Sequence, residues 1–291
     1  MKGPVDGTKW RWIIFGRFSW QRLVRSTLII YGIIALIGLF FAEHFIFPYR
    51  DCSYDKSLPG LEMITSEDGT AIATRYVEVP DAPFLVLHFH GNYEDLGQLE
   101  PLFEIFRERG FSTLGMDYRG CGLSEGLPKE ASCYQDAEAL YQQARLLGYR
   151  PEQILIWGRS VGSGLAVELA TRHQVKALVL ESPFSTAFRV ATRVPLAPFD
   201  KFHNLKKMRS LEEPLFILHG TDDEIIPAWH SEKLYQRHQG PKERHLVEGA
   251  GHNDLWMYPL DDEWAALDAF LAEQEHRQRP YPSEAKIEAN R

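Results

Sequence analysis

The sequence has few cysteines, and their spacing does not suit a structural metal. Only three of the 291 residues are cysteine, Cys52, Cys121 and Cys133, and none forms a C-x-x-C pair. Zinc sites need cysteine and histidine clustered at short spacings, and disulfide scaffolds need more cysteine than this. We therefore expect no metal, no cofactor and no disulfide framework. Three free thiols are predicted, although an oxidising compartment would permit one bridge.

The main body also lacks an excess of basic residues. The chain has a formal net charge of −8, yet residues 1–26 hold six Lys or Arg and one Asp, a net of +5. The remainder therefore carries −13, because −8 minus +5 is −13. No basic patch for nucleic acid is expected on an acidic body of this kind. With 44% hydrophobic and 25% charged residues, the composition is that of a globular protein with a sizeable core.

One long hydrophobic run is present, near the N-terminus. Residues 26–42, "STLIIYGIIALIGLFFA", contain no charge, and as a helix they would span about 25 Å. Tryptophans and arginines alternate before the run, as in a segment that lies at a membrane surface. The pattern predicts a basic, aromatic segment over residues 1–26 and a single transmembrane anchor over residues 27–47. A cleaved signal peptide and a buried core helix are the alternatives.

The charges beside the anchor predict its orientation. Basic residues cluster before it, whereas only Arg50 and Lys56 follow it closely. The positive-inside rule then keeps the N-terminus in the cytoplasm and places the main body across the membrane. If the helix is instead re-entrant or peripheral, the main body is cytosolic.

Beyond residue 60, short apolar runs alternate with helical patterns. A hairpin turning at Asp68-Gly69 comes first, and buried runs such as "PFLVLHFHG" and "VKALVLESP" then alternate with helices. Such alternation predicts a mostly parallel sheet flanked by helices, with the hairpin as an antiparallel edge. We expect this α/β domain over residues 48–273, a small apolar cap within residues 184–213, and a polar tail over residues 274–291.

The most informative stretch is "ILIWGRSVGSG", residues 154–164, where a buried strand runs into a glycine-flanked serine and then a helix. This is G-x-S-x-G in the strand, turn and helix setting that exposes a nucleophilic serine. Gly158 and Gly162 would let strand and helix approach without clashing side chains. Ser160 is therefore the predicted nucleophile. The alternative is a serine that merely caps the helix.

Two later strand ends supply an acid and a histidine. "HGTDDEIIP", residues 219–227, offers Asp222 and Asp223, each able to orient a histidine. "EGAGHNDLW" places His252 in a glycine-rich loop after the last strand. The order Ser, Asp, His is that of an α/β-hydrolase. Ligands of such sheets bind beyond the carboxyl ends of the strands, where these residues would meet.

Acyl transfer also needs two N–H donors for the developing oxyanion. One is expected from the backbone of Val161, which follows the serine. The other is expected from the loop "HFHGNYEDLG", where Asn92 is the best candidate. His88 and His90 in this loop could suggest a metal, but no third ligand lies near them in the sequence.

At this point the chain resembles the α/β-hydrolases of the serine aminopeptidase-like group. It is most similar to their membrane-associated branch, which includes depalmitoylating thioesterases. The matching motifs are "HFHGN", "MDYRGCGLSEG", "GRSVGSG", "ESPFST", "HGTDDEIIP" and "GAGHND", and they span the whole predicted domain. Together they are specific for a fold and a triad, but much less so for a substrate.

The resemblance implies which acid serves the histidine. The family's H-G-x-x-D-x-x-x-P pattern falls on Asp223, which leaves Asp222 in a variable place. Glu181 follows a strand where some relatives carry another acid, and it stays the second candidate. Asp117 and Arg119 are expected to pin strand and loop by hydrogen bonds. Cys121 lacks the setting of a nucleophile.

The predicted protein is therefore a membrane-anchored serine hydrolase that cleaves an acyl ester or thioester through an acyl-enzyme. Its substrate would be an acyl-bearing small molecule, a lipid or a lipidated protein. The alternatives are an aminopeptidase-like peptidase and a non-catalytic binding protein on the same fold.

Overall fold

The structure is a computed structural model, and it describes residues 19–48, 51–192 and 200–277. The chain divides into two units, Met1–Ala42 and Glu43–Arg291. The described part of the first unit is almost entirely helix α2 (Trp20–Ile46), whose last residues belong to the second unit. Its 27 residues correspond to about 40 Å of helix. By length and composition it could cross a membrane, and it is the one such helix among the described residues.

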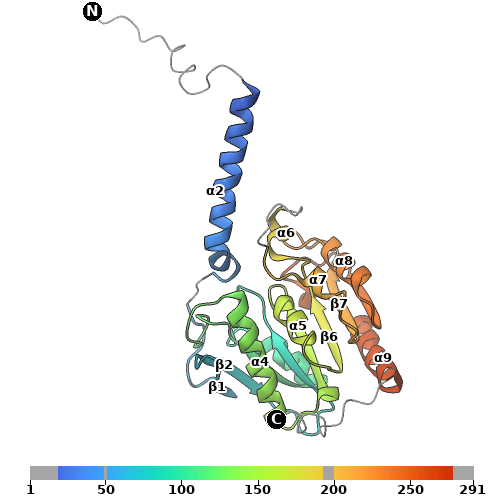
Figure 1. The fold of residues 1–291 in the computed structure, drawn as a ribbon. Coiled ribbons are helices and arrows are strands. Elements are labelled where there is room, and N and C mark those ends of the chain that lie inside the picture. The colour runs from blue at the N-terminus through green and yellow to red at the C-terminus, as the bar shows by residue number, and fades with distance from the viewer. Residues whose placement is uncertain (1–18, 49–50, 193–199, 278–291) are drawn as a thin grey trace, which may run out of the picture. The chain divides into compact units, whose positions relative to one another are not determined.

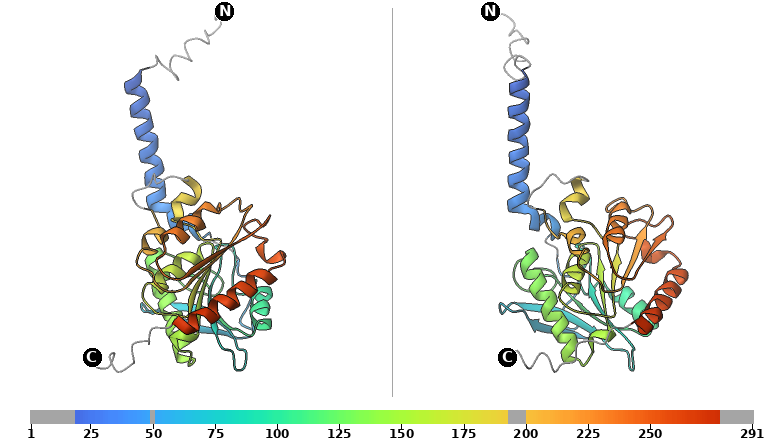
Figure 2. Two further views of the ribbon diagram at one scale, coloured as in Figure 1. Left: turned by 90° about the vertical axis from the view of Figure 1, so that its right-hand side faces the viewer. Right: turned by 45° about the vertical axis from the view of Figure 1, so that its right-hand side comes forward.

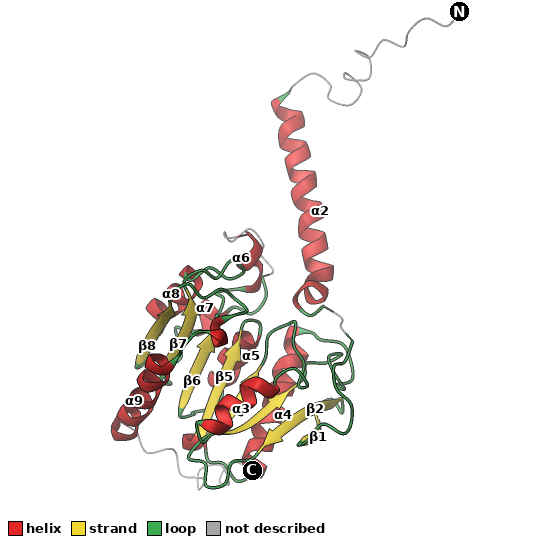
Figure 3. Cartoon of the chain, turned by 180° about the vertical axis from the view of Figure 1, so that it is seen from behind, coloured by secondary structure: helices red, strands yellow, loops and turns green. Residues whose placement is uncertain are grey.

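The second unit is built on an eight-stranded sheet with the order β1-β2-β4-β3-β5-β6-β7-β8 (Figures 1 and 3). The strands are β1 (Leu61–Thr65), β2 (Ala71–Val77), β3 (Leu85–Phe89), β4 (Ser112–Met116), β5 (Ile154–Arg159), β6 (Ala177–Glu181), β7 (Leu215–Gly220) and β8 (Lys242–Val247). Strands β3 to β8 are parallel, whereas β1 and β2 form the antiparallel edge. The expected α/β fold with an N-terminal hairpin is confirmed.

Helices cover both faces of this sheet (Figure 2). They are α3 (Glu100–Glu108), α4 (Glu130–Leu146), α5 (Gly162–Ala170), α6 (Ala187–Thr192), α7 (Asn204–Lys207), α8 (Trp229–Arg237) and α9 (Asp261–Arg277), with short 3₁₀ turns at Pro151–Gln153 and Leu255–Met257. Helices α3 and α9 contribute to one apolar core, and α4, α5, α7 and α8 contribute to the other. The sheet is therefore the middle layer of three.

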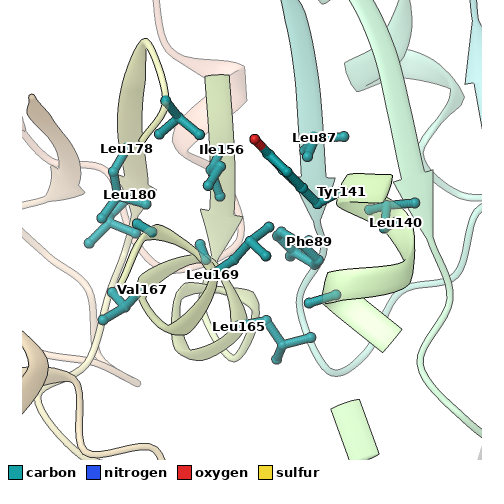
Figure 4. Close-up of a cluster of buried hydrophobic side chains, with 14 of the residues drawn as sticks. Leu87, Phe89, Leu140, Tyr141, Ile156, Leu165, Val167, Leu169, Leu178 and Leu180 are labelled. Atoms are coloured by element: carbon teal, nitrogen blue, oxygen red, sulfur yellow. The ribbon is translucent and has the colours of Figure 1, made fainter. Parts of the chain in front are cut away.

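The central strands supply side chains to both cores in alternation. Ile154 and Ile156 of β5 face the core with α4 and α5, whereas Leu155 and Trp157 face the core with α3 and α9. This is the period of two that a pleated strand imposes. Figure 4 shows the first of these cores, where Ile156 lies among side chains from β3, β6, α4 and α5. Burial on both faces explains why these strands are continuous apolar runs in the sequence.

The second unit includes the last turn of helix α2. Phe47 lies in its core, with its ring 5.2 Å from that of Tyr118 and 6.1 Å from that of Phe202. Lys201 pairs with Glu43 at 2.7 Å. The predicted anchor ends at Phe47, and this residue packs in the core of the second unit, because an aromatic side chain suits either an apolar core or a membrane interface.

The expected cap is described only in part. Helices α6 and α7 lie within it, and residues 193–199 are outside the described residues. Most of the predicted N-terminal segment and of the polar tail also lies outside them.

Candidate active site

Ser160 occupies a sharp turn between β5 and α5. Its φ is +50°, in the left-handed region that residues other than glycine rarely adopt. Its N–H donates to the carbonyl of Glu181 at 2.9 Å, and its own carbonyl accepts from the N–H of Ser163 at 3.0 Å. The turn is thus held from both sides in an unfavourable conformation. Such strain is typical of functional sites and requires support from the surrounding structure.

The two glycines around the serine are required by close contacts. A Cβ on Gly158 would lie 2.6 Å from the Cβ of Ala166 and from the carbonyl oxygen of Gly162. A Cβ on Gly162 would lie 2.0 Å from the carbonyl oxygen of Phe89. Both distances are far below a normal van der Waals contact, so any side chain here would push α5 away from β3 and β5.

His252 links the serine to an acid. Its Nε2 lies 3.0 Å from Oγ of Ser160, and its Nδ1 lies 2.7 Å from Oδ2 of Asp223. All three residues are buried, with exposed fractions of 8%, 6% and 4% for Ser160, His252 and Asp223. With the proton on Nδ1, Nε2 is free to accept the proton of the serine hydroxyl. The three residues come from the ends of β5, β7 and β8, which meet at one edge of the sheet.

Asp223 is held as a carboxylate. Burial alone would raise its pKa, but hydrogen bonds from His219 and His252 hold the pKa well below its usual range. The N–H groups of Ile225 and Ile226 also donate to Oδ1, at 3.0 and 2.7 Å. A carboxylate with this many donors remains charged and can orient an imidazole at neutral pH.

The other candidate acids lie elsewhere. Asp222 is exposed, and its carboxylate accepts a hydrogen bond from Thr221 at 3.2 Å. Glu181 is buried, and its carboxylate accepts from Arg159 at 3.0 Å and from the indole of Trp256 at 2.9 Å. Burial raises the pKa of Glu181. Neither acid hydrogen-bonds to His252.

The two expected oxyanion donors belong to adjoining segments. Gly162 abuts the carbonyls of Phe89 and His90, so the loop that carries Asn92 runs beside the turn that carries Val161. Within the described part of the chain, the N–H groups of Val161 and Asn92 donate to no protein acceptor.

The histidines of this loop do not form a pair. His88 packs its ring against Phe103 and Phe106, and burial lowers its pKa to about 3. Ligand atoms of His90, Asp117 and Cys121 lie within 4.8 Å of one another. However, Asp117 already accepts from the hydroxyl of Tyr54 and from the N–H of Leu96. These contacts explain the cluster as a hydrogen-bonded support for the loop.

The loop after β4 also has structural contacts. Arg119 pairs with Asp68 and Asp136, which lie in the hairpin turn and in α4. Burial raises the pKa of the Cys121 thiol to about 12, so it is a poor nucleophile at neutral pH. All three cysteines are free thiols.

Sequence reasoning missed one residue at this edge. Arg159 directly precedes Ser160 and is buried, with polar contacts to Glu94, to Glu181 at the end of β6 and to the backbone of His252. The sequence did carry a signal, because Arg159 is a charged residue at the end of an otherwise apolar, buried strand. A buried charge is costly unless it is paired, so such a residue predicts hydrogen-bonding partners nearby.

The fold and sequence define the class. A family model described as serine aminopeptidase, S33, matches residues 81–206. Among solved structures, an esterase from Pyrococcus furiosus superposes with a TM-score of 0.63 at 18% identity, covering 78% of this chain and 96% of that one. The chain belongs to the α/β-hydrolase superfamily, in its serine aminopeptidase-like group.

More similar sequences are found among curated proteins. Human alpha/beta hydrolase domain-containing protein 17B is 38% identical over 202 residues, which cover 67% of this chain and 70% of that protein. The Xenopus tropicalis protein 17C is 36% identical over 199 residues, which cover 66% and 64%. The chain is therefore a hydrolase relative of these proteins over most of its second unit.

Proposed function

We propose that this protein is a membrane-anchored serine hydrolase that cleaves an acyl ester or thioester. The observation that carries the proposal is the hydrogen-bonded series from Ser160 through His252 to Asp223. Residues of these types at these distances form the arrangement that activates a serine hydroxyl in many unrelated folds.

In the proposed reaction, His252 takes the proton of Ser160 as Oγ attacks the acyl carbon. Asp223 keeps the imidazole in the required tautomer and stabilises its charged form. The N–H groups of Val161 and Asn92 would stabilise the oxyanion. The alcohol or thiol leaves with the proton from His252, and water activated by the same imidazole then releases the acid.

The alternative of an aminopeptidase needs an acidic group free to bind the substrate's amino terminus. Glu181 is the acid nearest to that role, but its carboxylate already accepts from Arg159, Trp157 and Trp256. These contacts favour the ester or thioester over the peptide.

Helix α2 supports the membrane part of the proposal, because it is long and apolar enough to serve as a single-pass anchor. By the positive-inside rule, the basic residues before it support a cytoplasmic N-terminus with the second unit on the opposite side of the membrane. An anchor also raises the local concentration of acyl chains presented by lipids or lipidated proteins. The orientation is tested with a reporter fused at the C-terminus. If the reporter is active only in the cytoplasm, the proposed orientation is wrong and a re-entrant or peripheral helix with a cytosolic second unit is favoured.

The proposed chemistry is tested with a fluorophosphonate probe, which labels only an activated serine. The wild-type protein should be labelled, and the Ser160→Ala variant should not. A screen of butyryl, octanoyl and palmitoyl esters and thioesters, beside aminoacyl arylamides, then identifies the bond. Absence of labelling would favour a non-catalytic binding protein, and faster arylamide cleavage would favour the peptidase.

A further inference from the structure

Arg159 connects three segments of the candidate site. Its Nη1 lies 2.7 Å from Oε2 of Glu94, and its Nε donates to Oε1 of Glu181 at 3.0 Å. Its Nη2 donates to the backbone carbonyl of His252 at 3.0 Å and to Oδ1 of Asn253 at 3.1 Å. The side chain therefore contacts the loop after β3, the end of β6 and the loop after β8. Its own backbone is joined directly to Ser160.

Each carboxylate extends the connection by one more bond. The Oε2 atom of Glu94 that pairs with Arg159 also accepts the N–H of Gly91 at 2.8 Å, beside Asn92. The Oε1 atom of Glu181 that accepts from Arg159 also accepts from the indole of Trp256 at 2.9 Å. The loop that carries Asn92 and the loop that carries His252 are thus each connected by hydrogen bonds to this one guanidinium.

The space around the guanidinium is closely filled. A Cβ on Gly91 would lie 2.8 Å from Nη1 of Arg159, and Arg159 itself is 8% exposed. A guanidinium is planar and presents its donors in a rigid fork, whereas a lysine ammonium is a single point of charge. Four acceptors in different directions therefore match arginine and do not match lysine.

Stability alone does not account for such a cluster. The buried carboxylate of Glu181 and the half-buried carboxylate of Glu94 share one guanidinium, and burying charges carries a desolvation cost that well-packed apolar side chains would avoid. The cluster instead constrains geometry, because it sets where two loops lie relative to the end of β5.

We propose that Arg159 is a positioning residue that holds His252 and the Asn92 loop in register with Ser160. This inference rests on the proposed function in so far as those residues carry out catalysis. The positioning itself is a property of the two loops and can be measured separately from activity.

The first measurement is steady-state hydrolysis of p-nitrophenyl butyrate by Arg159→Met and Arg159→Lys. A small displacement of catalytic groups costs roughly 100-fold in rate, so kcat should fall by about that factor in both variants. We expect KM to change far less, because the Arg159 side chain is buried and its hydrogen bonds go to protein groups. Full activity in Arg159→Lys would overturn the proposal, because charge alone would then suffice.

Two substitutions of Glu94 distinguish a geometric role of its carboxylate from a role of its charge. Both of its hydrogen bonds to Gly91 and Arg159 go to the same oxygen, Oε2, so the amide oxygen of Glu94→Gln can accept both. Glu94→Gln should keep most of the wild-type kcat, whereas Glu94→Ala should lose it in the same way as Arg159→Met. Equal loss in both Glu94 variants would contradict a geometric role.

The second measurement is amide hydrogen exchange, which does not depend on catalysis. Arg159→Met should speed exchange in residues 90–96 and 250–258 while the central strands stay protected. Arg119→Met is the matched control, because Arg119 is also buried and pairs with two carboxylates, Asp68 and Asp136, outside the site. It should lower the melting temperature without faster exchange in those two loops and without loss of kcat at a temperature where it is folded.

The two proposals fail in different ways. If fluorophosphonate does not label the wild-type protein, the proposed function is wrong, and hydrogen exchange still decides whether Arg159 positions the loops. If labelling succeeds but Arg159→Met exchanges like the wild type in both loops, the positioning role is wrong and the hydrolase remains.

Discussion

Two buried arginines lie at or just after the ends of strands in the same sheet, and the partners of one lie in different parts of the fold from those of the other. Arg119, just after β4, pairs with Asp68 in the hairpin turn and Asp136 in α4. Arg159, at the end of β5, reaches instead the loops that carry the candidate site. A buried ion cluster can therefore serve either the framework or a site, and the location of its partners distinguishes the two.

The largest effect should follow from removing the nucleophile. Ser160→Ala and His252→Ala should each reduce esterase activity by on the order of 10⁴-fold or more, since residues that act as a unit fail together. Melting temperatures should stay close to the wild-type value, because neither change removes an acceptor of Arg119 or Arg159; the His252 atom that Arg159 contacts is its backbone carbonyl. Activity assays and thermal melts check this, and substantial turnover by Ser160→Ala would place the nucleophile elsewhere.

A neighbouring pair of aspartates gives the next effect. Asp223→Asn should lower kcat by roughly 10⁴-fold, because an amide favours the wrong tautomer of His252. Asp222→Asn is the matched control and should have almost no effect, since its side chain is exposed and does not contact the histidine. A larger loss at Asp222, or at Glu181, would mean that the acid has been wrongly assigned.

The Arg119 cluster should affect stability and not catalysis. Arg119→Met leaves Asp136 as an uncompensated buried charge, which costs about 3–5 kcal/mol of the free energy of unfolding. Replacing Asp136 by Leu in the same variant should recover much of that loss. Chemical denaturation measures both changes. If the Arg119→Met protein is fully stable yet inactive, the prediction that Arg119 serves stability and Arg159 serves the site is wrong.

The smallest effect concerns pH and Glu181. Burial raises the pKa of this carboxyl above its ordinary value of about 4.3. The folded state therefore binds the proton more tightly than the unfolded state, and the protonated form favours folding at low pH. As pH rises from about 4 toward neutrality, this contribution is lost. The wild type should therefore lose stability relative to Glu181→Gln over that range, as measured by denaturation at several pH values. If the difference in the free energy of unfolding between the two proteins does not change with pH, the pKa of Glu181 is not raised.

The sequence predicted the sheet and the three residues of the candidate site for one reason. Parallel strands are recognised by their apolar runs, and their carboxyl ends must meet at one edge, so Ser160, Asp223 and His252 could be brought together without coordinates. The partners of Arg159 could not be found in this way. They lie on loops whose course depends on glycine contacts and side-chain hydrogen bonds, which have no period in the sequence.

Phe47 shows a second limit. A phenylalanine at the end of an apolar helix has the same sequence signature whether it lies at a membrane interface or in a core. Only its contacts with Tyr118 and Phe202 assign it to the core of the second unit.

The same phenylalanine determines which cut between the two units would leave the core of the second unit intact. A protease acting after Ala42 would release a fragment that keeps Glu43, Phe47 and their contacts with Lys201, Tyr118 and Phe202. A fragment that begins at residue 52 would lose them and leave a cavity in the core, and emptying a phenylalanine site costs about 3–5 kcal/mol. Glu43 and Phe47 therefore decide whether a fragment cut from the first unit keeps the core of the second unit filled.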